Sequence, residues 1–317
     1  MEILIHKILA RLSAFLEMNE LRVLDALIHE RLIQLGSDPV EQANYSYWER
    51  QSHSWRQTVS PVRPSEGDIK IYERFLKEKG NVKRILILGS TPELREMVAR
   101  ETDATIYVAD ESFSMLAGML KFAPHVDPLK EKWIKDDWLV LPLPAKFFDV
   151  ILGDVVLHQV APKREHAFLQ HMLFLLQDEG VFITRLFFLD KEFFEKDIDS
   201  IVRNIYSSNY SATEKRTLIT LQVLWLYADL AARKLNRPRS AEAFDCYARE
   251  RKMKDPILEN VRDVLTADEH LCRSWSPPDE KDLLKMVSSA FFIQDRRIAE
   301  DYQVAHYFPV VLLSPRR

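Results

Sequence analysis

The sequence predicts an α/β fold with a doubly wound, mostly parallel sheet that closes with an antiparallel hairpin. From residue 84 onward, short β-rich runs alternate with helical stretches, and parallel strands need such crossover helices. The runs are apolar almost without interruption, as strands covered on both faces are. The last two runs, FFIQDRRIAE and HYFPVVLLSP, lie close enough in the chain to pair with each other.

The segments around this core are predicted to be helical. Apolar residues recur at helical spacing between Ile5 and Ile28, and an aromatic linker follows in which Pro61 and Pro64 would break a helix. The alternation also stops after the fourth run, where the pattern again indicates helices. The expected units are an N-terminal helical segment, a core and a helical insertion before the last two strands: residues 1–80, 81–189 with 276–317, and 190–275. Core strands are expected at 84–89, 105–110, 148–154 and 180–188.

Composition narrows the possible partners. The chain has 317 residues and a formal net charge of −4, whereas nucleic-acid binding normally relies on a basic face, so no nucleic-acid partner is expected. Charges interrupt the apolar residues of the N-terminus, and no apolar stretch is long enough to cross a bilayer, so no membrane partner is expected. Cys246 and Cys272 lie far apart without metal-ligand spacing. We therefore expect no metal site and a cytoplasmic protein.

The first core strand ends in ILILGSTPELR, which predicts a tight strand-to-helix turn. Gly89 and Ser90 would form the turn, Thr91 the N-cap, and Pro92 the first helical position. This places a helix N-terminus at the ligand-binding edge of the sheet. A single glycine after a strand is also common in turns that bind nothing, so a ligand role for Gly89, Ser90 and Thr91 stands beside a purely structural one.

Glu93 lies in the first turn of this helix, where a dinucleotide-binding fold places its pyrophosphate against free N–H groups. A carboxylate at that position would repel phosphate, and the glycines of the GxGxxG pattern are missing apart from Gly89. A cationic ligand without phosphates meets no such objection. The alternative is that Glu93 only stabilises the helix dipole.

Asp110 ends the second strand, 21 residues after Gly89, where nucleoside-binding folds keep an acid for the ribose hydroxyls. A carboxylate suits this role because it accepts from two neighbouring hydroxyls at once. The alternative is an N-cap for the next helix. Glu111 and Met115, which follow directly, are further candidates for ligand contacts.

A second group of candidates flanks the third expected strand. Asp137 and Trp138 precede it, and an acid beside an aromatic ring could hold the amine and cover the ring of a purine. The alternatives are a surface acid and a core tryptophan. Gly153 and Asp154 close the strand, and Asp154 is a candidate both for ligand contacts and for catalysis.

His158 follows one helical turn later. A neutral imidazole with an ordinary pKa near ~6.5 could accept a proton at physiological pH. Asp154 is the competing base, and a structural histidine is the alternative to both.

The order of these pieces resembles the class I S-adenosylmethionine-dependent methyltransferases: a turn after strand one, an acid after strand two, an Asp with an aromatic residue, then DVILGD and a final hairpin. It is similar to a branch that carries LGxTPEL in place of the glycine-rich turn and a W…W…RPS pattern before it. Here that pattern is Trp48, Trp55 and Arg63-Pro64-Ser65. The resemblance implies S-adenosylmethionine as the cofactor, a lead-in that folds over it, and Trp55 and Arg63 as cofactor contacts. Trp48 and Trp55 could equally be core anchors.

The activity implied is methyl transfer to a small-molecule acceptor, with residues 190–275 serving as lid and acceptor pocket. Such a reaction depends chiefly on positioning. The first rival is an NAD(P)-dependent oxidoreductase, which shares the strand, the turn and the distant acid. The second is a catalytically silent module that keeps the fold for binding. The acceptor and the oligomeric state are open at this stage.

Overall fold

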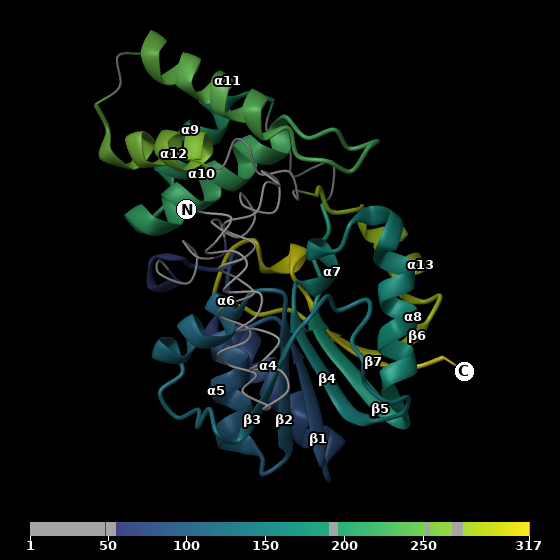
Figure 1. Ribbon diagram of the computed structural model, residues 1–317. Coiled ribbons are helices and arrows are strands. Elements are labelled where there is room, and N and C mark those ends of the chain that lie inside the picture. The colour runs from purple at the N-terminus through teal and green to yellow at the C-terminus, as the bar shows by residue number, and fades with distance from the viewer. Residues whose placement is uncertain (1–47, 49–54, 190–195, 252–253, 268–274, 317) are drawn as a thin grey trace, which may run out of the picture.

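The computed structural model describes residues 48, 55–189, 196–251, 254–267 and 275–316 (Figure 1). Its centre is one seven-stranded sheet in the order β3-β2-β1-β4-β5-β7-β6. The first five strands in this order, β3, β2, β1, β4 and β5, are parallel to one another, and β7 is antiparallel to both β5 and β6. The strand bounds are β1 Arg84–Leu88, β2 Thr105–Asp110, β3 Glu131–Lys135, β4 Phe148–Asp154, β5 Leu176–Arg185, β6 Phe291–Arg297 and β7 Val310–Pro315.

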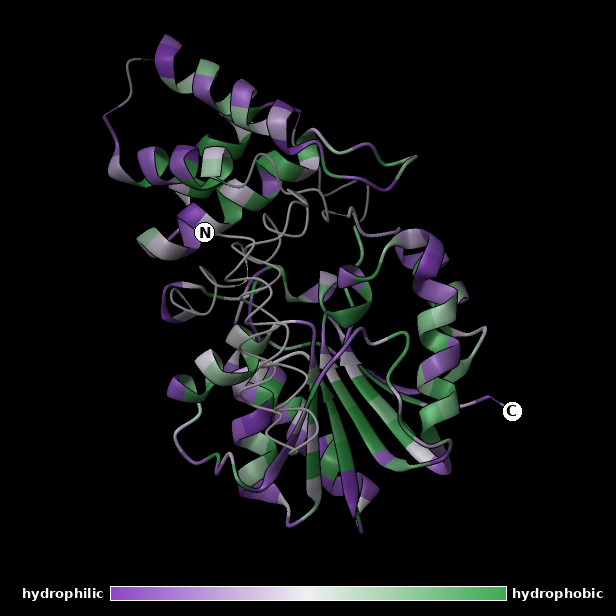
Figure 2. Cartoon of the chain, viewed as in Figure 1, coloured by the Kyte–Doolittle hydropathy of each residue, from purple (hydrophilic) through white to green (hydrophobic). Residues whose placement is uncertain are grey.

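Helices cover both faces of this sheet. Successive side chains of a strand point to opposite faces, and in β1 apolar side chains on both faces pack against helices. Ile85 and Ile87 of β1 pack in one apolar cluster with α4 (Glu66–Lys79), α5 (Pro92–Glu101) and α6 (Phe113–Gly118). Leu86 and Leu88 pack in another with α8 (Glu165–Leu175) and α13 (Glu280–Val287). In Figure 2 the strands are mostly hydrophobic, whereas the helices also carry hydrophilic residues. The doubly wound α/β arrangement is confirmed.

The remaining long helices form a separate layer beyond one end of the strands (Figure 1). They are α9 (Ile198–Ser207), α10 (Ala212–Leu226), α11 (Arg237–Glu250) and α12 (Pro256–Ala267), and we call them the helical block. Their buried residues, among them Ile201, Val223, Phe244 and Val261, belong to the same continuous cluster as the α8 side of the sheet. The division of the chain into three units, with this block as a lid, stays a prediction.

Three details differ from the expected strands. β3 was not anticipated, because three of the five residues of EKWIK, at the sheet edge, are charged and the segment lacks the continuous apolar run of a central strand. The reversed strand of the hairpin, β7, lies inside the sheet between β5 and β6. β5 ends at Arg185, three residues before the apolar run does. Residues 1–47 and 49–54 of the expected helical lead-in lie outside the described residues.

Among the described residues, no helix has the length and apolar character required to cross a membrane.

Candidate functional site

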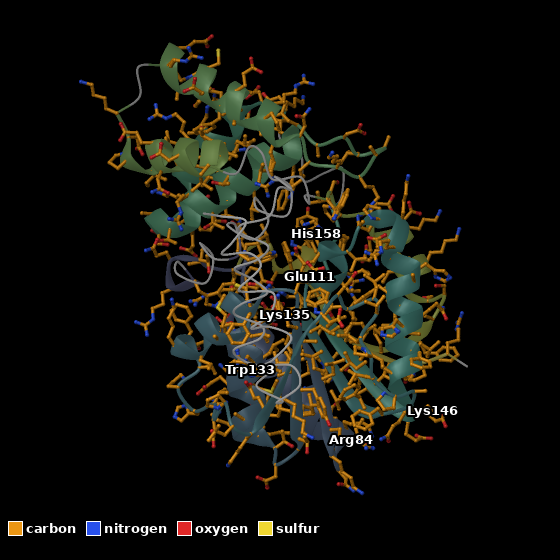
Figure 3. All side chains as sticks on the ribbon, viewed as in Figure 1. Arg84, Glu111, Trp133, Lys135, Lys146 and His158 are labelled. Atoms are coloured by element: carbon orange, nitrogen blue, oxygen red, sulfur yellow. The ribbon has the colours of Figure 1, made fainter. Side chains whose placement is uncertain are left out.

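The site residues gather where the parallel strands end. Figure 3 shows Glu111 and His158 at the sheet end that faces the helical block, and Arg84 and Lys146 at the opposite end. Because β1 pairs with β2 on one side and β4 on the other, the crossovers change direction between β1 and β4. Ligands of such sheets bind in the crevice at this switch point.

The turn after β1 requires its glycine. Gly89 has a φ of +78°, a conformation that costs other residues roughly 1–2 kcal/mol, and its N–H donates to the Ala109 carbonyl at 2.8 Å. A Cβ at this position would lie 3.5 Å from the Trp138 ring. Pro92 opens α5 as predicted, but Thr91 makes no side-chain cap. Thr91 is thus the N-cap residue by position, as predicted, but it contributes no capping hydrogen bond; proline at the first helical position already removes one of the N–H groups that a cap would satisfy.

Asp110 is held at the end of β2 by two donors. Its carboxylate accepts from the Ser90 hydroxyl at 2.9 Å and from the Ser112 N–H at 2.9 Å. Burial raises the pKa of Asp110 from 3.8 to about 6, although both hydrogen bonds oppose the rise. The alternative considered for Asp110 was the N-cap of the next helix. Ser112, two residues later, is the N-cap of α6.

Glu93 lies beneath residues from the segment before α4. Its Oε1 accepts from the Trp55 indole N–H at 2.9 Å and lies 3.5 Å from the Arg63 guanidinium. Its Oε2 is buried and has no hydrogen-bond partner among the described residues. Burial raises the pKa of Glu93, and the Trp55 and Arg63 contacts oppose that rise. A half-satisfied buried carboxylate is costly, which marks Oε2 as an acceptor that a ligand could use.

Asp137 and Trp138 lie beside the same turn. Trp138 donates its indole N–H to the Ala109 carbonyl at 2.8 Å, so its ring is fixed next to Gly89. Asp137 accepts from the Leu139 N–H at 3.0 Å and from Arg164 at 3.1 Å. Both side chains are half-buried, and the Asp137 carboxylate keeps acceptor capacity beyond these two bonds.

The two further candidates after β2 differ in their exposure to solvent. Glu111 is exposed, whereas Met115 is 5% exposed and packs with Trp55 and Met119 in a small cluster of its own. Trp48 packs on that cluster. Trp55 therefore combines both readings of the sequence, since its ring anchors this cluster while its N–H reaches Glu93.

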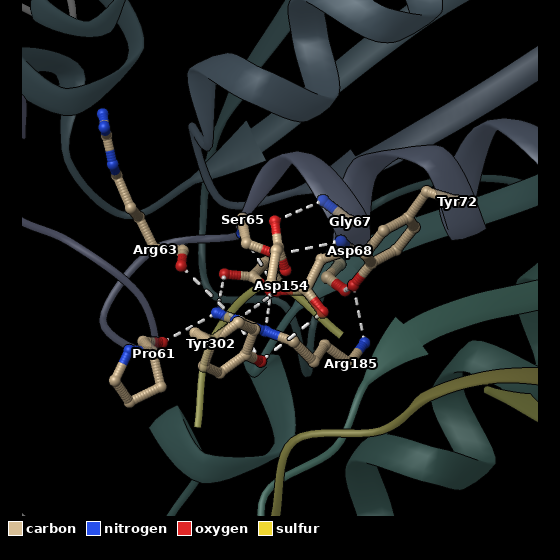
Figure 4. A network of polar contacts seen from close by, with 11 residues as sticks. Pro61, Arg63, Ser65, Gly67, Asp68, Tyr72, Asp154, Arg185 and Tyr302 are labelled. Atoms are coloured by element: carbon tan, nitrogen blue, oxygen red, sulfur yellow. Dashed lines mark hydrogen bonds and ion pairs between the residues drawn. The ribbon is translucent and has the colours of Figure 1, made fainter. Parts of the chain in front are cut away.

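Asp154 belongs to a buried polar network (Figure 4). Arg185 donates to both of its oxygens, at 2.8 Å and 3.0 Å. Burial raises the pKa of Asp154 to about 6, opposed by Arg185 and reinforced by Asp68 and Glu93. Gly153 precedes it because a Cβ there would come within 2.7 Å of Val156. This arrangement favours an orienting role for Asp154 over the role of a free base.

His158, in α7 (Val156–Gln159), lies edge-on to Phe187 with ring centroids 5.1 Å apart. Its Nδ1 is buried without a hydrogen-bond partner among the described residues. Burial, with the charges of Arg233 and Arg237, lowers the pKa of His158 to about 4. The ordinary pKa expected from the sequence was therefore wrong, because desolvation penalises the imidazolium. His158 is neutral at physiological pH and is a weak base.

The sequence analysis missed the centre of the network. Arg185 is fully buried and contacts Asp68 and Tyr302 as well as Asp154, and the Tyr72 hydroxyl bonds the Gly153 carbonyl at 2.8 Å. The signal was present, because Arg185 is the one charged residue of the apolar run GVFITRLFF. A charge in a buried strand requires partners.

Comparison with known proteins bears on the fold. No family model and no curated protein matches this sequence. The 1,6-didemethyltoxoflavin N1-methyltransferase of Burkholderia thailandensis, solved with its substrate and S-adenosylhomocysteine, has a TM-score of 0.51 at 12% identity, over 89% of this chain and 92% of that one. A protein of Rhodobacter sphaeroides described as a putative Zn-dependent alcohol dehydrogenase has a TM-score of 0.55 at 16% identity, over 86% and 99%.

The chain thus shares its fold with both proteins, one of them a methyltransferase as the sequence resemblance implied, while the two descriptions differ in chemistry. Among the described residues, no group of three or more His, Cys, Asp or Glu side chains is placed to share a metal ion.

Proposed function

We propose that this protein is an S-adenosylmethionine-dependent methyltransferase that acts on a small molecule. The observation that carries the proposal is Glu93, whose Oε2 is buried and unsatisfied within the described residues at the N-terminus of α5. A dinucleotide would bring its phosphates to this helix end, where the Glu93 carboxylate repels them. A ligand with an ammonium group could donate the hydrogen bond that Oε2 lacks, and its positive charge would be attracted to the Glu93 carboxylate.

The other end of the site suits a nucleoside. Asp110 accepts two bonds already, and a carboxylate offers about four acceptor positions, so it can also accept from ribose hydroxyls. Asp137 and Trp138 stand next to the same turn and would bind adenine through a carboxylate and a ring face. The cofactor itself supplies an electrophilic methyl group. The toxoflavin methyltransferase, which shares this fold and binds S-adenosylhomocysteine, is consistent with this assignment.

The acceptor would enter between the carboxyl ends of the parallel strands and the helical block. His158 lies there, beside a cavity of about 10 Å³ that Phe187 and Arg233 also line, room for roughly one water molecule. Because its pKa is lowered to about 4, His158 would accept a hydrogen bond from the acceptor and orient it. The chain would then contribute mainly through positioning and exclusion of water.

Calorimetry with S-adenosylmethionine, S-adenosylhomocysteine, NAD and NADP tests the proposal. We expect binding of the first two and none of the dinucleotides. Binding of NAD or NADP without a response to S-adenosylmethionine would establish the oxidoreductase alternative. A protein that binds S-adenosylmethionine but transfers no methyl group to any of a panel of small amines, phenols and carboxylates would favour the silent binding module.

A further inference from the structure

Arg185 has more partners than an ion pair needs. Its guanidinium donates to Asp154, to Asp68 at 2.8 Å and to the Tyr302 hydroxyl at 3.3 Å. It also donates to two backbone carbonyls, those of Pro61 at 2.9 Å and Arg63 at 3.4 Å. The side chain is fully buried, and Pro61, whose carbonyl it bonds, is buried as well.

The two carbonyls belong to residues 55–65, which we call the strap. The strap runs from the short helix η1 (Trp55–Gln57) to Ser65, the residue that caps α4 in a reciprocal bond with Asp68. It has little regular structure of its own, so its path depends on contacts with the rest of the chain. Figure 4 shows Pro61, Arg63 and Ser65 converging on Arg185, Asp68 and Asp154.

At its other end the strap reaches the proposed cofactor site. Trp55 donates to Glu93, and the Arg63 guanidinium lies 3.5 Å from the same carboxylate oxygen. Between them, the Gln57 carbonyl accepts from Arg216 of α10 at 2.6 Å. The strap thus joins the network around Arg185, the first turn of α5 and the helical block.

We propose that Arg185 is a positioning residue for cofactor binding that acts through the strap. By fixing the carbonyls of Pro61 and Arg63, it sets where Trp55 and Arg63 meet Glu93, and so which Glu93 oxygen is left for the ligand. The inference rests on the proposed function.

Arginine is required here for its shape as well as its charge. Its five N–H groups form a rigid fork that can satisfy two carboxylates and two carbonyls together, whereas lysine has three donors on one nitrogen. Arg185→Lys keeps the positive charge between Asp68 and Asp154 but cannot reach all the partners. It therefore separates the loss of the strap from the loss of charge.

The experiment measures S-adenosylhomocysteine binding by calorimetry, per folded molecule, together with hydrogen exchange across residues 55–65. We expect Arg185→Lys to weaken binding at least 10-fold and to speed exchange in the strap. Glu131→Gln is the matched control, because it breaks a second fully buried ion pair, Arg95–Glu131, whose further hydrogen bonds among the described residues go to Leu116 and Trp133 and not to the strap. It should lower the melting temperature and leave affinity within twofold.

A double-mutant cycle tests whether Arg185 acts through Trp55. Trp55→Phe should weaken binding about 5- to 10-fold in the wild-type background and have little further effect in Arg185→Lys, because residues in one network are not additive. If Arg185→Lys does not fold, Asp68→Asn replaces it, since Asp68 bonds both Arg185 and the Ser65 N–H; we then expect about fivefold weaker binding.

The outcomes separate the two proposals. If the wild-type chain binds no S-adenosylhomocysteine, the proposed function and this inference both fail. If the wild type binds and the strap exchanges faster in Arg185→Lys at unchanged affinity, or if the two substitutions are additive, only the inference fails.

Discussion

Replacing Asp110 by Asn should stabilise the protein while weakening cofactor binding. The pKa of Asp110 rises from 3.8 to about 6 because the ionised carboxylate is buried. This rise corresponds to about 3 kcal/mol, at ~1.4 kcal/mol per pKa unit, which the ionised side chain costs the folded state at pH 7. Asp110 is only half-buried, so solvent screens part of this cost and we expect Asp110→Asn to recover about 1–2 kcal/mol, or a few degrees in melting temperature.

The same change removes the charge that would bind the ribose. A hydrogen bond to a charged group contributes about 1.5–3 kcal/mol, so affinity for S-adenosylhomocysteine should fall roughly 10- to 100-fold. The matched control is Asp149→Asn, at the opposite end of β4, where the carboxylate accepts from the Lys83 and Arg84 N–H groups at 3.0 Å and 2.8 Å. That substitution should change stability without changing affinity.

The pH dependence gives a second check on Asp110. Its folded-state pKa lies above the unfolded value, so between about pH 4 and 6 the folded state binds more protons and stability falls as pH rises. Asp154 titrates in the same range, and therefore the difference between wild type and Asp110→Asn isolates Asp110. A variant that melts below the wild type at pH 7 and binds the cofactor equally well would refute the reasoning and leave Asp110 with a purely structural role.

Three further expectations concern the rest of the site. Glu93→Gln should weaken S-adenosylmethionine binding about 10-fold, from the loss of a charged hydrogen bond, without creating NAD affinity, since the phosphate-binding glycines remain absent; calorimetry with both ligands measures this, and strong NAD binding would contradict it. His158→Ala should lower turnover by about 10²-fold or less, the lower end of the range for a general base, because the pKa of His158 is lowered to about 4. Steady-state kinetics measures this, and a far larger loss of turnover would contradict it. Cofactor binding should slow hydrogen exchange in the helical block, and unchanged exchange throughout it would remove the lid role.

The sequence predicted the features that depend on local pattern. Continuous apolar runs located β1, β2, β4 and β5, and the proline after the first turn located the start of α5. β3 escaped because an edge strand buries only part of its surface, and its charged residues are compatible with a loop. Periodicity carries no information about which of two edges a short polar strand joins.

The parts of the site that depend on long-range contacts could not be read in the same way. The partners of Arg185 lie 31 residues away at Asp154 and 117 away at both Asp68 and Tyr302, and no spacing rule connects them. The pKa of His158 likewise depends on how deeply α7 is buried and on charges from residues 233 and 237. The residue types at the strand ends predicted which side chains are candidates for the site, but the pKa values of these side chains depend on how the chain packs around them.

The carboxyl ends of the strands carry an excess of negative charge. The carboxylates of Asp68, Glu93 and Asp154 contact the guanidinium groups of Arg63 and Arg185 there, and Asp110 adds a fourth carboxylate, which accepts from Ser90. A positively charged ligand relieves the repulsion among these carboxylates. A neutral one does so less.

S-adenosylmethionine carries a sulfonium charge that its demethylated product lacks, so the site should bind the donor more tightly than the product. A net charge about 10 Å away contributes roughly 1–2 kcal/mol at an effective dielectric constant near 20, or about 10-fold in affinity. Because the pKa values of Asp110 and Asp154 are both about 6, this preference should be full at pH 8 and shrink at pH 5, where both carboxyls become protonated. Calorimetry of both ligands at the two pH values measures the ratio, and a ratio that does not change with pH would mean that these carboxylates do not face the sulfonium.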